Sequence, residues 1–226
     1  RLFGHNGVVD INDAPVTEQF TRAIPADENY PIAASLIKTL FKPTGPFNML
    51  GIHRPRQKDL MKARRPIMVD GSGKFLNQDF AMAGNRISMF GMPPARALAD
   101  IHHYAIKSTK GFLNKRARGL PNRKKDVGIN YWVERNFNTV EDTSIAAMRP
   151  ATEAQFNKLM ALPGVEALHK KAVAWHQSQT EELVRDPDVH KLLTQIVTAG
   201  SSEVVPKNLQ KQLISWYHEV QKSSEN

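Results

Sequence analysis

The residues best suited to chemistry lie between positions 101 and 119. His102 and His103 stand near the end of a short apolar run, and Lys107 and Ser108 follow shortly after. A neutral imidazole binds divalent metal ions. Helix N-termini and Lys or Arg side chains both favour phosphate oxygens. The order of histidine, lysine, helix start and basic cluster therefore indicates a site for a metal-bound diphosphate.

A second interpretation of the same stretch needs no ligand. One of the two histidines would then be a core residue, and the basic cluster would be a solvated helix face. Adjacent strand residues face opposite sides, so only one of His102 and His103 can point into a site. The spacing alone leaves both interpretations open.

The elements that must position these residues fall into three zones. Residues 1–106 are rich in Gly, Pro and Met, and their short apolar runs predict strands bounded by turn residues. The predicted strands are residues 38–42, 49–53, 67–69 and 99–106. Residues 70–73, Asp-Gly-Ser-Gly, predict a tight turn. Residues 107–148 are densely basic, and residues 151–226 are helical in pattern.

Capping residues mark the predicted helices. Ser108 is expected to begin a helix that ends at Gly119, and a second helix is expected over residues 129–136. Further along, Thr152 and Gln155 fit a capping box, and Asp186 before a proline fits an N-cap. Two apolar faces follow at helical spacing: Val189, Leu192, Leu193, Ile196 and Val197, then Leu209, Leu213, Trp216, Tyr217 and Val220.

Composition narrows the class of protein. The 226 residues are 41% hydrophobic, contain no cysteine and carry a formal net charge of +9. Absence of cysteine excludes disulfides and thiolate metal sites and fits a reducing compartment. No apolar run reaches the length of a transmembrane helix, and no signal-peptide pattern follows Arg1. The positive charge favours an anionic partner: nucleic acid, acidic lipid or a phosphate-bearing substrate.

The histidine segment resembles a family signature. His103-Tyr104-Ala105-Ile106-Lys107-Ser108, followed by Phe112-Leu113, Lys115-Arg116 and Arg118-Gly119, is similar to the pattern of a glycosyltransferase family 2-like group found in bacterial surface-polysaccharide loci. Other segments resemble that family's motifs in the family's order: residues 1–7, 15–20, 38–43, 51–55 and 136–145. The likeness covers about residues 1–148.

The resemblance implies an α/β fold of the GT-A type, with a nucleotide-sugar-binding domain over residues 1–148 and a helical region over 149–226. It also implies inverting, metal-dependent transfer of a sugar from a nucleotide-sugar donor to a glycan or lipid-linked acceptor. The family holds Mn²⁺ or Mg²⁺ with an Asp-x-Asp motif that would lie upstream of Arg1. We therefore expect the chain to be the C-terminal half of such an enzyme.

The resemblance also assigns roles to the cations and the histidine. It implies that His103 is the metal ligand, with His102 as the competitor in register. Substrate binding is implied for the residues that would hold the donor diphosphate: Lys107, Ser108, Lys115, Arg116 and Arg118. Fixed cations there would stabilise the charge that builds on the leaving group.

The acceptor side is assigned in the same way. An inverting transfer needs a carboxylate to take the proton from the acceptor hydroxyl, and Glu18 matches the family glutamate. The next family residue, an arginine, is Gln19 here. Glu141 and Asp142 are the alternative pair, although a helix cap or a pairing with a nearby arginine is the preferred role for them. His53 is expected to line the acceptor cleft or to serve the turn before Pro55.

Two other functions compete with glycosyl transfer. The chain could be a non-enzymatic basic module that binds nucleic acid or an anionic surface, given its charge and the basic run 116–125. No helix-turn-helix, zinc-finger or RNA-recognition pattern supports nucleic acid. It could also be a degenerate transferase domain kept as a scaffold. We expect a cytoplasmic location, with peripheral contact at the inner face of the membrane through anionic lipid.

Overall fold

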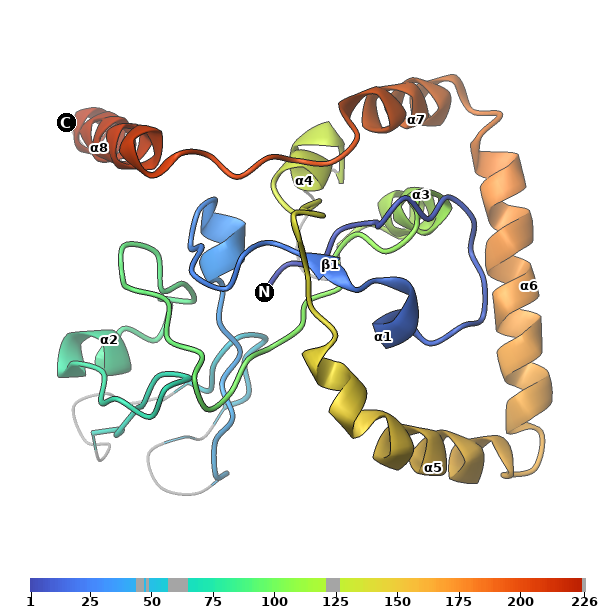
Figure 1. Cartoon of the computed structure of the whole chain (residues 1–226), viewed down its shortest axis with the longest axis horizontal. Helices are drawn as coiled ribbons and strands as arrows, with labels where there is room; N and C mark the ends of the chain where they lie inside the picture. Colours follow the sequence, from blue (N-terminus) through green and yellow to red (C-terminus); the bar gives the residue numbers. More distant parts are fainter. Residues whose placement is uncertain (44–46, 48, 57–64, 121–126, 225–226) are drawn as a thin grey trace. The chain divides into compact units, whose positions relative to one another are not determined.

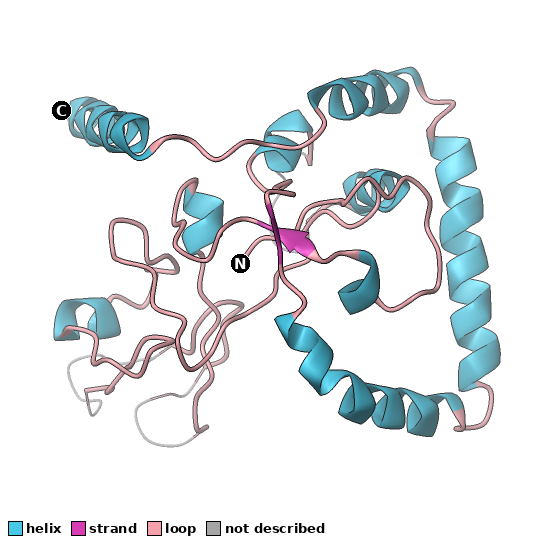
Figure 2. Ribbon diagram, in the orientation of Figure 1, coloured by secondary structure: helices cyan, strands magenta, loops and turns pink. Residues whose placement is uncertain are grey.

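The computed structural model describes residues 1–43, 47, 49–56, 65–120 and 127–224 (Figure 1). The chain divides into two compact units, each built from segments far apart in sequence. Unit 1 comprises Arg1, Ala26–Ile101 and Glu203–Asn226. Unit 2 comprises Leu2–Pro25 and His102–Ser202. Helices and loops make up most of the described chain, with one small sheet (Figure 2).

The sheet lies in unit 2. Strands β1 (Arg22–Ala23) and β2 (Val140–Glu141) pair in antiparallel fashion. Phe3 extends this pairing through an antiparallel bridge to β1, and Leu2 forms a parallel bridge with His103. Leu2 and Phe3 are almost fully buried. Four separate segments thus meet in unit 2, each contributing only one or two paired residues.

Asparagine side chains provide many of the hydrogen bonds that longer paired strands would have made between these segments. Asn6 has a left-handed backbone with φ of 52°, and its Oδ1 accepts the Arg22 backbone N–H at 2.7 Å. Asn138 Oδ1 accepts the Asn6 backbone N–H at 2.7 Å. Asn136 is fully buried, and its Oδ1 accepts the His5 backbone N–H at 2.8 Å. Buried backbone groups need partners, and these amides supply them where strands are too short to do so.

Helices form the larger part of unit 2. They are α1 (Val16–Gln19), α3 (Thr109–Arg118), α4 (Ile129–Val133), the 3₁₀ helix η2 (Ser144–Met148), α5 (Arg149–Met160), α6 (Val165–Leu183) and α7 (Pro187–Ala199). Helix α3 packs against α6 and α7, and α4 packs against α7 (Figure 1). The hydrophobic cluster between them includes Ile106, Phe112, Leu113, Val127, Trp132, Val189, Leu192 and Ile196.

Unit 1 contains the 3₁₀ helix η1 (Ile32–Ser35), α2 (Gln78–Met82) and α8 (Lys207–Ser224), joined by long loops. A buried carboxylate ties α8 to the rest of the unit. Glu28 is 3% exposed, accepts a hydrogen bond from Gln210 Nε2 at 2.8 Å and forms an ion pair with Lys207. Because Gln210 is also buried, this contact fixes the first turn of α8.

The strands predicted in residues 1–106 are wrong. Within those four runs the structure has only isolated bridges, at Met49, Val69 and His103. Proline and glycine interrupt the runs, and none of them finds a neighbouring strand of matching length. The predicted turn over residues 70–73 is confirmed, since Gly73 N–H donates to Asp70 O at 3.0 Å and Ser72 N–H donates to Asp70 Oδ1 at 2.8 Å.

Two of the predicted helix starts are confirmed. Ser108 caps α3, which ends at Gly119 with φ of 74°, and Asp186 caps α7 through the Asp188 and Val189 N–H groups. The second basic-zone helix is shorter than expected, because α4 ends at Val133. The capping box is wrong. Thr152 lies inside α5, where its hydroxyl donates back to Met148 O at 3.0 Å.

The predicted α/β class holds in a coarse sense only, as helices with one two-stranded sheet among the described residues. The expected boundary at residues 148/149 falls inside unit 2, because α6 packs on α3 and α7 packs on α3 and α4. Helix α8 belongs to unit 1 instead. Among the described helices, none combines the length and the apolar character that crossing a bilayer requires.

Replacing Asp186 with alanine tests the cap of α7. The variant leaves the Asp188 and Val189 N–H groups without their side-chain acceptor. We expect the free energy of unfolding to fall by about 1 kcal/mol, measured by urea denaturation. Asp13→Ala, at an exposed carboxylate before α1, is the control and should change it by less than about 0.5 kcal/mol. Equal losses in the two variants would contradict the assigned cap.

Candidate functional site

The N-terminus of α3 is closed by the protein itself. Ser108 is buried, and its Oγ accepts the Gly111 N–H at 3.1 Å. The N–H groups of Thr109 and Lys110 donate to the carbonyls of residues 8 and 9, each at 3.0 Å. The amides that were expected to receive a phosphate therefore already have acceptors. Ser108 acts as a helix cap in this geometry, and any phosphate contact must come from side chains.

Lys107 stands directly before this cap in an unusual conformation. Its φ of 62° places a non-glycine residue in the left-handed region, although the side chain is exposed. Such a conformation costs roughly 1–3 kcal/mol and persists where the surroundings impose it, often at functional sites. The adjoining Ser108 cap fixes the backbone that follows. Lys107 is thus held in place by its neighbours.

The side chain of Lys115, which belongs to α3, lies against the aromatic ring of Tyr131. Its Nζ donates to Ala105 O and to Tyr131 Oη, each at 2.7 Å, and lies 4.4 Å from the Tyr131 ring centroid. The guanidinium of Arg135 lies 3.9 Å from the same centroid. One tyrosine ring therefore contacts two cations, an arrangement that its quadrupole stabilises.

Further positive charge surrounds this pair. Burial, together with the smaller effects of the positive charges of Arg135, Arg118 and Lys107 in that order, lowers the pKa of Lys115 from 10.5 to about 8. Each of these influences opposes the ammonium ion of Lys115. We call these four residues and the ring of Tyr131 the cationic cluster. An anion bound beside it would relieve the repulsion.

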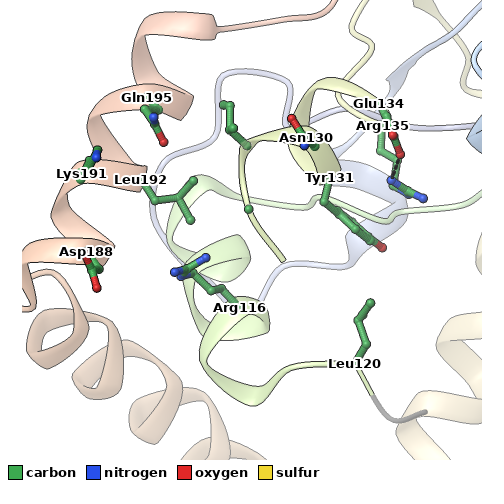
Figure 3. Close-up of a pocket in the computed structure, with 12 residues that line it drawn as sticks. Arg116, Leu120, Asn130, Tyr131, Glu134, Arg135, Asp188, Lys191, Leu192 and Gln195 are labelled. Atoms are coloured by element: carbon green, nitrogen blue, oxygen red, sulfur yellow. Dashed lines mark hydrogen bonds and ion pairs between the residues drawn. The ribbon is translucent and has the colours of Figure 1, made fainter. Parts of the chain in front are cut away.

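A pocket of about 640 Å³ adjoins the cationic cluster (Figure 3). Tyr131 and Arg135 line it from the α4 side, Arg116 from α3 and Lys191 from α7. Glu134 also lines it and pairs with Arg135 at 2.7 Å. The volume lies in the range of small-molecule sites, roughly 300–1,000 Å³. Its basic side chains suit a ligand that carries phosphate.

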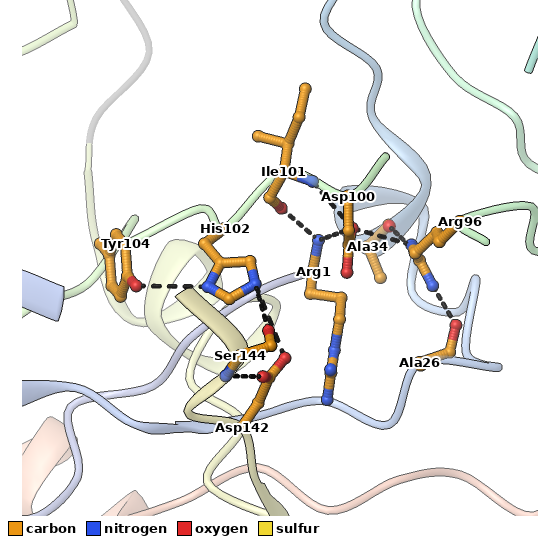
Figure 4. A network of polar contacts seen from close by, with 10 residues as sticks. All are labelled: Arg1, Ala26, Ala34, Arg96, Asp100, Ile101, His102, Tyr104, Asp142 and Ser144. Atoms are coloured by element: carbon orange, nitrogen blue, oxygen red, sulfur yellow. Dashed lines mark hydrogen bonds and ion pairs between the residues drawn. The ribbon is translucent and has the colours of Figure 1, made fainter. Parts of the chain in front are cut away.

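A second polar group of unit 2 centres on His102 (Figure 4). Its Nε2 lies 3.6 Å from Asp142 Oδ2 and 3.4 Å from Ser144 Oγ, and its Nδ1 lies 3.4 Å from Tyr104 Oη. Asp142 Oδ1 also accepts the Ser144 backbone N–H at 2.9 Å. The side chains of His102 and Asp142 are 7% and 8% exposed. Asp142 therefore contacts both the Ser144 N–H and a histidine, although the residue at the N-cap position of η2 is Thr143.

The two adjacent histidines differ in their surroundings. His103 is exposed, and its backbone forms the parallel bridge to Leu2. His102 stacks on Phe3 with ring centroids 4.5 Å apart and lies inside the polar group. His102, the alternative to His103 as metal ligand, is thus the histidine that contacts a carboxylate. Within the described ranges, no group of three or more His, Asp or Glu side chains is arranged to hold a metal ion.

Glu18 and His53 line neither the cationic cluster nor its pocket. Glu18 forms a surface ion pair with Arg149 at 3.2 Å, and Arg149 also binds Glu153. His53 belongs to unit 1, where its Nδ1 lies 2.8 Å from Ile37 O. This contact joins His53 to a distant segment of unit 1 and tests neither the acceptor-cleft role nor the turn role. Catalysis by Glu18 would require that it leave its arginine partner.

The structure places the expected cations in two neighbouring locations. Lys107, Lys115 and Arg118 come together in the cationic cluster, and Arg116 lines the adjoining pocket. Tyr131, Arg135 and Lys191 were not expected. Tyr131 and Arg135 are four residues apart, so the helix predicted over residues 129–136 would have placed them on one face, although α4 ends at Val133. Lys191 lies on α7, so only the packing of α7 brings it to the pocket.

Lys115 gives the stability of the fold a pH dependence. Below about pH 8 it is charged in the folded and the unfolded chain, and the cost of burying its charge is fully present. Between about 8 and 10.5 only the unfolded chain keeps the proton, so rising pH adds to the free energy of unfolding.

We expect Lys115→Met to lose this gain, so the free energy of unfolding of the wild type should rise relative to the variant as pH increases through this window. Urea denaturation at several pH values measures the difference. Lys171→Met, at an exposed position of α6, is the control and should run parallel to the wild type. Parallel curves for Lys115→Met would contradict the assigned burial.

Comparison with known proteins adds no relative. A scan of protein-family models gives no match, and neither the curated proteins nor the solved structures contain a significant match. The motif resemblance consequently has no support from a related protein. What the chain does must be inferred from its motifs and from the geometry of unit 2.

Proposed function

We propose that the chain is part of a glycosyltransferase that uses a nucleotide-sugar, and that the cationic cluster with its adjoining pocket binds the donor diphosphate. The observation that carries this proposal is the half-buried ammonium of Lys115, which lies with the guanidinium of Arg135 against the ring of Tyr131, beside a pocket that Arg116 and Lys191 also line. A cluster of like charges raises the free energy of the free protein. Binding a diphosphate removes that repulsion, so part of the binding energy comes from the site itself.

The cluster is also suited to the chemistry of transfer. Negative charge builds on the diphosphate as the bond between the sugar and its phosphate oxygen breaks, and fixed cations stabilise that charge best. Lys115 is held by Ala105 O and Tyr131 Oη, and Arg135 is held by Glu134 and the Tyr131 ring. These charges need little reorganisation when the leaving group becomes more negative.

The packing of the motif segments supports the same proposal. Residues 1–7 and 136–145, which resemble separate family motifs, are joined in unit 2 through hydrogen bonds of Asn136 and Asn138. The GT-A-type fold is part of the proposal, as is inversion at the sugar. Glu18 remains the proposed base because of its motif, and a movement away from Arg149 is required of it.

Metal dependence is a separate part of the proposal. Bound Mn²⁺ or Mg²⁺ would neutralise diphosphate oxygens. Among the described residues, His102 and Asp142 form only a two-residue donor set, so they do not make a complete metal site. We therefore derive no catalytic step through the ion. His103 remains the ligand that the resemblance implies.

Calorimetric titration of the chain with UDP and GDP, each with and without Mn²⁺, tests the proposal. We expect micromolar binding of at least one nucleotide. Lys115→Met and Arg135→Gln should each weaken it about 10-fold or more, as the loss of a charge-assisted hydrogen bond does. Lys171→Met on α6 is the control for net charge and should bind as the wild type does. His103→Ala and His102→Ala show which histidine, if either, the Mn²⁺-dependent part requires.

The result that overturns the proposal is a folded chain that binds neither nucleotide under any of these conditions. The rival function has a specific observation in its favour, the net charge of +9 with Lys107 and Arg118 exposed. Under that rival, a short RNA or DNA would bind, and its affinity would fall steeply with salt. Equal weakening by Lys115→Met and Lys171→Met would also favour the rival, because a diffuse charge effect does not depend on position.

A further inference from the structure

Helix α6 packs against α3 along one side (Figure 1). Thr180 is fully buried, and Val165, His169 and Val173 are half-buried. Successive residues of an α-helix are turned by about 100°, so these four side chains fall within an arc of about 80°. We call this arc the inner side of α6.

Large apolar side chains stay exposed on another side of α6. Leu168 is 68% exposed, and Trp175 is 55% exposed although its ring lies 4.9 Å from that of His176. Lys171 and Glu182 are exposed as well. Leu168, Lys171, Trp175 and Glu182 fall within an arc of about 60°, whose centre is about 130° from that of the inner side. We call these four residues the outer stripe.

The charges of the outer stripe complement those of an inverted copy of itself. The midpoint between Lys171 and Glu182 falls between residues 176 and 177, next to Trp175. If a second α6 lay antiparallel around a two-fold axis at this midpoint, Lys171 of each copy would face Glu182 of the other. The two Trp175 residues would then be offset by about 4.5 Å along the helices. A parallel pair would instead place like charges opposite each other.

We propose that the outer stripe of α6 binds the outer stripe of a second copy of this chain, with the two helices antiparallel around a two-fold axis. Burial of an exposed tryptophan and an exposed leucine from each copy supplies the apolar contact. The stripe carries one positive and one negative charge, so it has no net attraction for anionic lipid or nucleic acid. A second copy presents both charges at the required spacing.

This proposal does not rest on nucleotide binding, because none of the four stripe residues lines the pocket beside the cationic cluster. Two helices of α6 length, about 28 Å, bury less than the roughly 1,600 Å² of a standard interface. We therefore expect a weak dimer that dissociates on dilution. Denaturation and nucleotide titration below the dissociation constant concern the monomer, so Lys171→Met remains a suitable control for them.

Sedimentation velocity of the whole chain over a range of concentrations measures the association. Trp175→Ser should weaken the dimer about tenfold or more, because a buried aromatic anchor carries much of the binding energy of such contacts. Thermal unfolding checks that this variant is folded, which we expect because the side chain is half exposed in the monomer.

Charge exchange tests the antiparallel arrangement. Lys171→Glu and Glu182→Lys each place like charges opposite each other at two symmetric positions, so each should weaken the dimer about fivefold or more. The double variant restores opposite charges at both positions and should associate within about twofold of the wild type. Lys211→Glu, at an exposed position of α8, makes the same change in net charge as Lys171→Glu and should leave the dimer unaltered.

Sedimentation as a monomer at every concentration would overturn the proposal, as would a dimer that Trp175→Ser leaves intact. A double variant that associates no more tightly than the single variants would overturn the antiparallel pairing. Equal weakening by Lys211→Glu would assign the association to net charge. A monomeric chain that binds phosphatidylglycerol vesicles, and loses that binding in Trp175→Ser, would make the outer stripe a lipid-binding surface instead.

Discussion

Unit 2 depends on asparagine side chains for the hydrogen bonding of its backbone. The segments that meet there pair over only one or two residues, so a regular ladder cannot satisfy their buried N–H and C=O groups. Asn6, Asn136 and Asn138 supply the missing partners through bonds between the two ends of the unit's sequence. An amide bonds through both its oxygen and its nitrogen, so a single side chain connects two segments.

This constraint extends to the cationic cluster. The Nδ2 of Asn136 and the Nε1 of Trp132 both donate to Gly200 O, at 2.6 and 2.9 Å. Gly200 ends α7 and Trp132 belongs to α4, so the two helices are fixed to each other at that point. Tyr131 is next to Trp132 and carries Lys115 and Arg135 on its ring. The amide network thus helps to fix the position of Tyr131, whose ring both cations contact.

The sequence predicted those elements whose signals are local. Ser108 with Gly119 and Asp186 with Pro187 each mark a helix end within a few residues, and both helices are present. The strands failed because pairing requires a partner elsewhere in the chain, and an apolar run does not reveal whether one exists. The sequence could not decide whether His102 or His103 points into a site for the same reason. The bridge between His103 and Leu2, a residue distant in sequence, sets the direction of both side chains. Three cluster cations were predicted because they lie near one another in sequence, whereas Lys191 required the tertiary structure.

The buried carboxylate of Glu28 has its ion pair and a hydrogen bond from Lys207 and Gln210, which lie about 180 residues later in the sequence. Burial of Glu28 therefore depends on α8. Cleavage ahead of Lys207 would remove the cation and the amide together. The carboxylate would then be an unpaired buried charge, which costs several kcal/mol unless water reaches it. Proteolytic removal of α8 would therefore disturb the packing around Glu28 as well as the structure at the cleavage site. The packing of unit 1 requires an intact α8.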